Sequence, residues 1–207
     1  MVEPKNPKRV NRMGYSARTV VSTLRPSLGK RCWHVSVGGA TLPTFSLALG
    51  RRLPREAPLP NPRQPAMFRR YEPEIAFYVW CTWRLDSASG VVASSDTSEA
   101  EIAKGLHRLV GEALKRATVS PPAWDLTLEF TNDLVLKIFC DHAGRKPSFG
   151  GNWEATVAMR AVYAGPGEKL EIATVPPIEH RLNKASRLAT AGVAGVKHRG
   201  ILGRRRG

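Results

Sequence analysis

Two Cys-x-His triplets are the strongest chemical coincidence in this sequence: Cys32 with His34, and Cys140 with His142. In a β-strand, residues i and i+2 face the same side with Cβ atoms about 6.5 to 7 Å apart, too far for the hydrogen bond of a nucleophile and its base. The spacing suits chelation better, and two such pairs meeting in space would form a Cys2His2 zinc site. The alternative is that these residues are structural and fill the core.

The sequence also contains five tryptophans, each within or beside a stretch with the composition of a β-strand. Most of them are expected in the core. Trp80 and Trp83 have opposite parity, so on one strand they face opposite sides. We therefore predict that one of the two is partly exposed and contacts a protein partner.

Familiar catalytic motifs are missing from the sequence. It has no Gly-x-Ser-x-Gly elbow, no His-Glu-x-x-His, no phosphate-binding loop and no dinucleotide fingerprint. Carboxylate pairs such as Asp125 and Glu129 are typical of a solvated strand face. The sequence therefore favours a protein that is not an enzyme and has no cofactor, with zinc as the alternative.

The formal net charge of +15 is concentrated at the two ends of the chain. Residues 1–31 carry eight basic side chains against one acidic, as do residues 176–207, whereas residues 32–175 carry sixteen against fifteen. A folded nucleic-acid reader places its basic residues on the fold itself. Binding to nucleic acid through the ends, with Arg204, Arg205 and Arg206 as contacts, would be non-specific and salt-dependent.

Proline, glycine and a period of two predict a strand-dominated α+β fold, an antiparallel meander with one main helix. Strands are expected at residues 32–37, 44–49, 74–85, 112–120, 153–159 and 169–173. The proline-rich stretch 53–73 and residues 87–97 are expected to be irregular. Ser98 and Glu101 form a capping box, which predicts that the helix begins there.

The stretch WDLTLEFTNDLVLKIFCDH, residues 124–142, predicts a hairpin whose register is set by its apolar pattern. A two-residue turn would pair Leu128 with Lys137, whereas a three-residue loop at 131–133 pairs Leu128 with Leu136 and makes one face apolar. Such loops need a left-handed residue, which Asn or Asp can supply. In this register Cys140 and His142 point inward.

Domain organisation follows from the charge and the strand pattern. We expect a disordered basic tail at residues 1–27, one β-rich domain at 28–175 and a second basic tail at 176–207. Leu28-Gly29 and Val110-Gly111 precede similar strands, which suggests a duplicated unit with half-repeats at 28–86 and 109–173. No secretory signal, no spanning segment and an odd number of cysteines indicate a cytoplasmic protein without membrane contact.

Residues 109–172 contain a glycine before a strand, then DLTLEF, LKIFCD, NWE and GPG followed by LEI. This pattern resembles an uncharacterised family of small bacterial β-rich proteins of unknown function. The resemblance implies a strand-rich fold with one helix and no particular reaction. By analogy with small bacterial immunity proteins, the leading hypothesis is a non-enzymatic module that binds an unidentified protein partner through a sheet face or edge.

Overall fold

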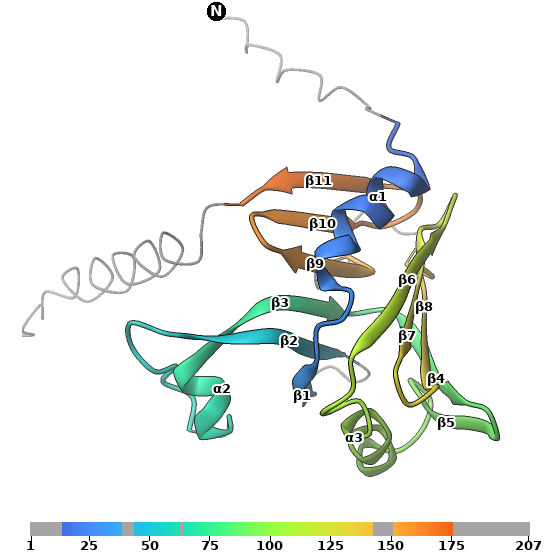
Figure 1. The fold of residues 1–207 in the computed structure, drawn as a ribbon. Helices are drawn as coiled ribbons and strands as arrows, with labels where there is room; N and C mark the ends of the chain where they lie inside the picture. Colours follow the sequence, from blue (N-terminus) through green and yellow to red (C-terminus); the bar gives the residue numbers. More distant parts are fainter. Residues whose placement is uncertain (1–13, 39–43, 63, 143–150, 176–207) are drawn as a thin grey trace, which may run out of the picture.

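The computed structural model describes residues 14–38, 44–62, 64–142 and 151–175, which form two antiparallel sheets and short helices (Figure 1). The first sheet has the order β1-β2-β3-β9-β10-β11 and the second the order β5-β4-β8-β7-β6. The elements are α1 (Ala17–Leu24), η1 (Arg25–Ser27), β1 (Cys32–Val37), β2 (Phe45–Pro54), α2 (Ala66–Arg70), β3 (Tyr71–Val79), β4 (Thr82–Ser87), β5 (Gly90–Ser94), α3 (Glu99–His107), β6 (Leu114–Ser120), β7 (Asp125–Phe130), β8 (Val135–Phe139), β9 (Trp153–Val157), β10 (Arg160–Ala164) and β11 (Leu170–Thr174). The strand-dominated α+β prediction is confirmed.

The described elements occur as two halves with the same order, a helix followed by five strands, and β11 is added at the end. In each half the first three strands form a meander, and the next two join the sheet of the other half. As a result, β3 pairs with β9 and β4 pairs with β8, so the third strand of each half pairs with the fourth of the other. The two halves are therefore interlocked.

Details of the pairing repeat between the halves. The β1–β2 ladder shifts register between Cys32 and His34, and the β6–β7 ladder shifts between Leu114 and Arg116. The amide of Gly29 donates to the carbonyl of Leu114 at 2.8 Å, and the amide of Gly111 donates to that of Cys32 at 2.7 Å. Each of these two bonds becomes the other when the halves are exchanged, which indicates an approximate two-fold axis between the halves. The half-repeats suggested by the sequence agree with this order, but each repeat begins with its helix.

Helices α1 and α3 occupy equivalent places. Each begins at a serine, Ser16 or Ser98, whose side chain accepts a hydrogen bond from the backbone of the third helical residue. Helix α1 packs on β6 and also reaches β9 and β10, while α3 packs on β1 and β5. The capping box at Ser98 and Glu101 is confirmed.

The expected boundary at residue 28 is wrong, because part of the predicted N-terminal tail belongs to the core. Val20 and Leu24 of α1 are fully buried, and so is Ser27 in η1. The basic charge of residues 1–31 obscured the short apolar stripe of one eight-residue helix. Residues 1–13 and 176–207, with the disorder predicted for them, lie outside the described residues.

The strand predicted at 74–85 is two strands. The chain leaves the first sheet after Val79 and enters the second at Thr82, so Trp80 and Cys81 form the crossing. Two segments expected to be irregular also contain structure. The proline-rich stretch contains α2 and the ends of β2 and β3, and residues 87–97 contain β5. β10 was not predicted.

The hairpin of β7 and β8 has the predicted register, with Leu128 opposite Leu136 and Leu126 opposite Ile138. Asp133 takes the left-handed conformation, at a φ of 59°. The apolar side chains of this hairpin join those of the first sheet in one core, with Trp83, Trp153, Phe77 and Phe130 as its largest fully buried members. No helix in the described part of the chain is long and apolar enough to cross a bilayer.

Candidate binding surface on the β2–β3 arm

The β2–β3 hairpin continues beyond the sheet as an extension that we call the arm, residues 50–74. It contains the end of β2, the connecting segment with α2, and the start of β3. In the other half, the equivalent strands β7 and β8 are joined by the short connection 131–134. Figure 1 shows the arm extending away from the second sheet. The arm is therefore the main departure from the two-fold repeat.

Glu74 fixes the base of the arm. Its carboxylate accepts hydrogen bonds from the backbone N of Arg51 at 2.9 Å and from Nζ of Lys30 at 3.2 Å. Gly50 has a φ of 78°, a backbone conformation that favours glycine, and a Cβ there would lie 2.5 Å from Oε2 of Glu74. Burial alone would raise the pKa of Glu74, but these hydrogen bonds and the charges of Lys30 and Arg51 together lower it.

We expect Glu74→Gln to lower the free energy of unfolding by about 1 kcal/mol at neutral pH. Because the folded-state pKa lies below the ordinary value of 4.5, the stabilisation by Glu74 is complete above about pH 4.5 and is lost as the pH falls through the folded-state pKa. The difference in unfolding free energy between the wild-type protein and Glu74→Gln should therefore shrink as the pH falls below about 4.5. Urea unfolding measures it, with exposed Glu56→Gln as the control. A difference that does not change with pH would contradict this role.

An aromatic cluster lies where the arm meets β1. The ring centroid of Phe68, on α2, is 4.8 Å from that of His34 and 6.4 Å from that of Trp33. Trp33 and His34 are consecutive on β1, next to its bulge, and their ring centroids are 5.9 Å apart. The short helix α2 thus places one aromatic side chain against two from the edge strand of the first sheet.

Two arginines of the arm lie over these rings. The guanidinium carbon of Arg52 is 5.4 Å from the ring centroid of Trp33, and that of Arg55 is 5.8 Å from the centroid of Phe68. Such cation–π contacts orient a guanidinium group while leaving its N–H donors available. Arg55 also forms an ion pair with Glu72 at 3.5 Å. Among the described residues, no carboxylate pairs with Arg52 or with exposed Arg70.

Three polar atoms in this cluster are buried without a hydrogen-bond partner among the described residues: Nε1 of Trp33, Nε2 of His34 and Nε of Arg55. Burial, and then the charge of His107, lowers the pKa of His34, so its imidazole is neutral near pH 7. A buried donor without a partner costs about 1 to 3 kcal/mol. The cluster therefore contains polar atoms whose hydrogen-bonding capacity the described residues do not use.

The predicted zinc ligands do not come together. β1 is the edge strand of the first sheet, whereas β8 lies in the middle of the second. The thiol of Cys32 is directed at the carbonyl of His34, 3.5 Å away, and burial raises its pKa to about 12. The thiol of Cys140 donates to the carbonyl of Trp124, at 3.2 Å.

The fourth predicted ligand, His142, contacts a different group: its Nδ1 lies 3.2 Å from the carbonyl oxygen of Gly151. In the described part of the chain no group of three His, Cys, Asp or Glu residues could hold a metal ion. The zinc alternative required the two pairs to meet, and in the described part of the chain they do not. The separation follows from topology, which places the two triplets in different sheets.

The two tryptophans proposed as partner contacts differ in burial. Trp83 is 1% exposed and packs edge-to-face on Phe45, with ring centroids 5.1 Å apart, so it is the buried member of the pair and is not available as a contact. Trp80 is half-buried and stacks on exposed Tyr78 at 6.1 Å. Arg204, Arg205 and Arg206 lie outside the described residues.

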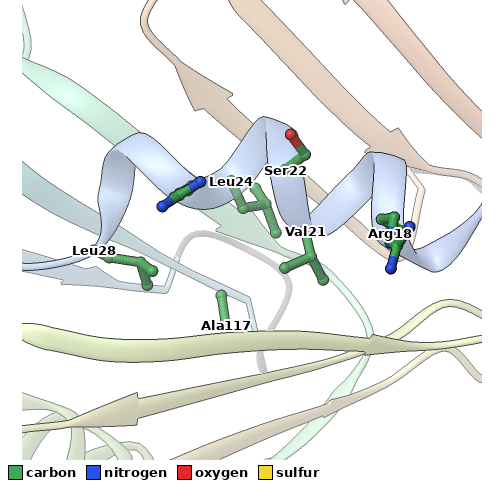
Figure 2. Close-up of a pocket in the computed structure, with 7 residues that line it drawn as sticks. Arg18, Val21, Ser22, Leu24, Leu28 and Ala117 are labelled. Carbon is green, nitrogen blue, oxygen red and sulfur yellow. The ribbon is translucent and has the colours of Figure 1, made fainter.

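A pocket lies between α1 and β6 (Figure 2). Val21, Leu24 and Leu28 lie on the side of the helix and of the following turn that faces Ala117. The lining residues are Arg18, Val21, Ser22, Leu24, Arg25, Leu28 and Ala117. This pocket is mainly apolar, with basic residues at its rim.

Comparison of the chain with protein-family models, with curated proteins and with solved structures finds no match. The resemblance of residues 109–172 to a bacterial family of unknown function thus stays a prediction.

The basic charge of the arm is hidden in the near-neutral total of residues 32–175, so the sequence did not predict it. Residues 50–70 alone contain six arginines and one acidic residue, Glu56. A shorter window would have shown this basic segment. Its contact with Trp33 and His34 depends on the folded position of α2, and no local pattern predicts that contact.

Proposed function

We propose that this chain is a non-enzymatic protein-interaction module that binds an acidic segment of a partner protein on the arm. The observation that carries the proposal is the cluster of Trp33, His34 and Phe68, with two arginines over its rings and three buried polar atoms without partners. Aromatic and arginine side chains are those that dominate binding energy at protein interfaces. An immunity-type role, in which such a module blocks its partner, is one form of this proposal.

The charges on the arm favour sparse carboxylates over a continuous phosphate backbone. Glu56, Glu72 and Glu74 lie on the same arm as the arginines, so its positive charge is local. A guanidinium group can hold a carboxylate through two parallel hydrogen bonds, which gives geometric specificity. Nucleic-acid binding through the chain ends is the competing function, supported by the charge of residues 1–31 and 176–207.

The test is to measure binding of the full chain to two labelled probes, poly-L-glutamate and single-stranded oligo-dT, by fluorescence anisotropy. The arm variant is Arg52→Gln with Arg70→Gln. The matched control, Lys104→Gln with Arg108→Gln, removes the same charge from two other exposed positions. We expect the arm variant to bind poly-L-glutamate about tenfold more weakly, equivalent to about 1.4 kcal/mol, and the control variant to change little.

A third variant, in which Arg204, Arg205 and Arg206 become Gln, tests the competing function. Under our proposal it leaves poly-L-glutamate binding almost unchanged. Equal weakening by the arm and control variants would mean that binding depends only on net charge and would refute the arm as a specific surface. Oligo-dT binding that is tighter than poly-L-glutamate binding and is lost with the three C-terminal arginines would favour the nucleic-acid function.

A further inference from the structure

Two of the three cysteines lie opposite each other where the halves meet. Cys81 occupies the crossing from β3 to β4, and Cys140 follows β8. The β4–β8 ladder pairs Thr82 with Phe139 at its end, so the next position places Cys81 opposite Cys140. Opposed residues on antiparallel strands have Cα atoms about 4.5 to 5.5 Å apart, within the range of about 4.4 to 6.8 Å that disulfides use.

The side chains also meet. Interaction with the Cys140 thiol, followed by burial, raises the pKa of Cys81. Cys81 is 1% exposed, whereas Cys140 is half-buried. The backbone N of Cys140 donates to Oδ1 of Asp125 at 2.7 Å, which fixes the chain at this position. A small oxidant therefore reaches Cys140 first, with Cys81 directly behind it.

We propose that Cys81 and Cys140 are a redox-active pair that forms a cross-strand disulfide in the folded chain. With glutathione disulfide as the oxidant, the Cys140 thiolate attacks one of its sulfur atoms and expels a glutathione thiolate, leaving a mixed disulfide on Cys140. Cys81 then loses its proton and attacks Sγ of Cys140, which expels the second glutathione thiolate, and the two protons lost by Cys81 and Cys140 protonate the two released glutathione thiolates through solvent. Two protein thiols are oxidised and one glutathione disulfide is reduced to two thiols.

Cys32 provides an internal control. It lies on β1 in the other sheet, fully buried, with its thiol directed at a backbone carbonyl. It has no cysteine opposite it, since its partner on β2 is Leu49. Cys32 therefore stays reduced when the pair oxidises.

The experiment treats the full chain with glutathione disulfide under native conditions, followed by denaturing thiol titration and peptide mapping by mass spectrometry. The expected result is a fall from three titratable thiols to one, with a peptide that links Cys81 to Cys140. Cys32→Ser keeps this cross-link. In Cys81→Ala the glutathione adduct is trapped on Cys140, because the resolving thiol is missing.

The outcomes separate the pair from simple exposure of a thiol. Three remaining thiols, a link through Cys32, or a link between two chains would each overturn the proposal. If Cys81→Ala fails to fold, the peptide map of the unmodified chain still decides, because it identifies the linked residues directly. Thiol titration over time also gives the rate of oxidation. Cys140→Ala should show no oxidation of the remaining thiols.

Discussion

Replacing Leu24 with alanine is expected to lower the free energy of unfolding by about 2 to 5 kcal/mol. Leu24 is fully buried on α1, where it packs into the core that both sheets share. The substitution leaves a cavity that the surrounding strands cannot close completely. A loss of this size would be a large fraction of the stability of a single domain.

The matched substitution is Leu106→Ala on α3, the equivalent position of the other half, which is also fully buried. Its loss is expected to lie in the same range of about 2 to 5 kcal/mol. Exposed Ser22→Ala, on α1, is the control and should change stability by less than about 0.5 kcal/mol. Urea unfolding monitored by circular dichroism gives all three values. A neutral Leu24→Ala would mean that residues 17–27 are the dispensable tail that the sequence suggested.

Replacing Trp153 with alanine is expected to cost about 3 to 5 kcal/mol. Its ring is fully buried on β9, and its Nε1 donates a hydrogen bond to the carbonyl of Trp124 at 2.8 Å. The alanine variant loses the packing of the ring and also leaves a buried carbonyl without that donor. Trp153 is therefore both a core residue and a link between the sheets.

Two further variants separate these effects. Trp153→Phe keeps an aromatic ring but removes the donor, so its loss should be smaller than that of the alanine variant. Trp80→Ala removes a half-buried ring at the crossing and should cost about 1 kcal/mol. Equal losses for Trp80→Ala and Trp153→Ala in urea unfolding would contradict the difference in burial. Fluorescence is unsuitable here, because each variant removes an emitting residue.

The features that the sequence predicted correctly are those with local causes. The register of the β7–β8 hairpin follows from its alternating apolar residues and from Asp133 in the turn. The start of α3 follows from its capping box. Both depend on residues a few positions apart, so no knowledge of the remaining chain was required.

The features that the sequence did not predict depend on pairing between segments far apart in the chain. The apolar run at 74–85 has the composition of one long strand, and only its pairing with β9 and then with β8 shows that it divides between two sheets. This division also decides which tryptophan is buried, since Trp83 pairs with Ile138 in the second sheet. Strand composition sets the propensity of a segment but not its neighbours.

The arm shows the same limit for the candidate site. Its basic residues can be read from the sequence, yet Trp33 and Phe68 are 35 positions apart and meet only because α2 folds back over β1. The two Cys-x-His triplets are the reverse case, a contact that the sequence suggested and the fold does not form. Their similarity suggested one site, although their strands occupy different sheets.

The interlocked halves have a consequence for the origin and assembly of the chain. Each sheet is completed by strands of the other half, so neither half could bury its own core when separated. Two identical half-length chains making the same contacts would form an isologous dimer, with β3–β9 and β4–β8 as its self-complementary interface. The present chain has the form of such a dimer joined by one connection between β5 and α3. In that arrangement the arm is free to diverge, because it lies outside the shared interface.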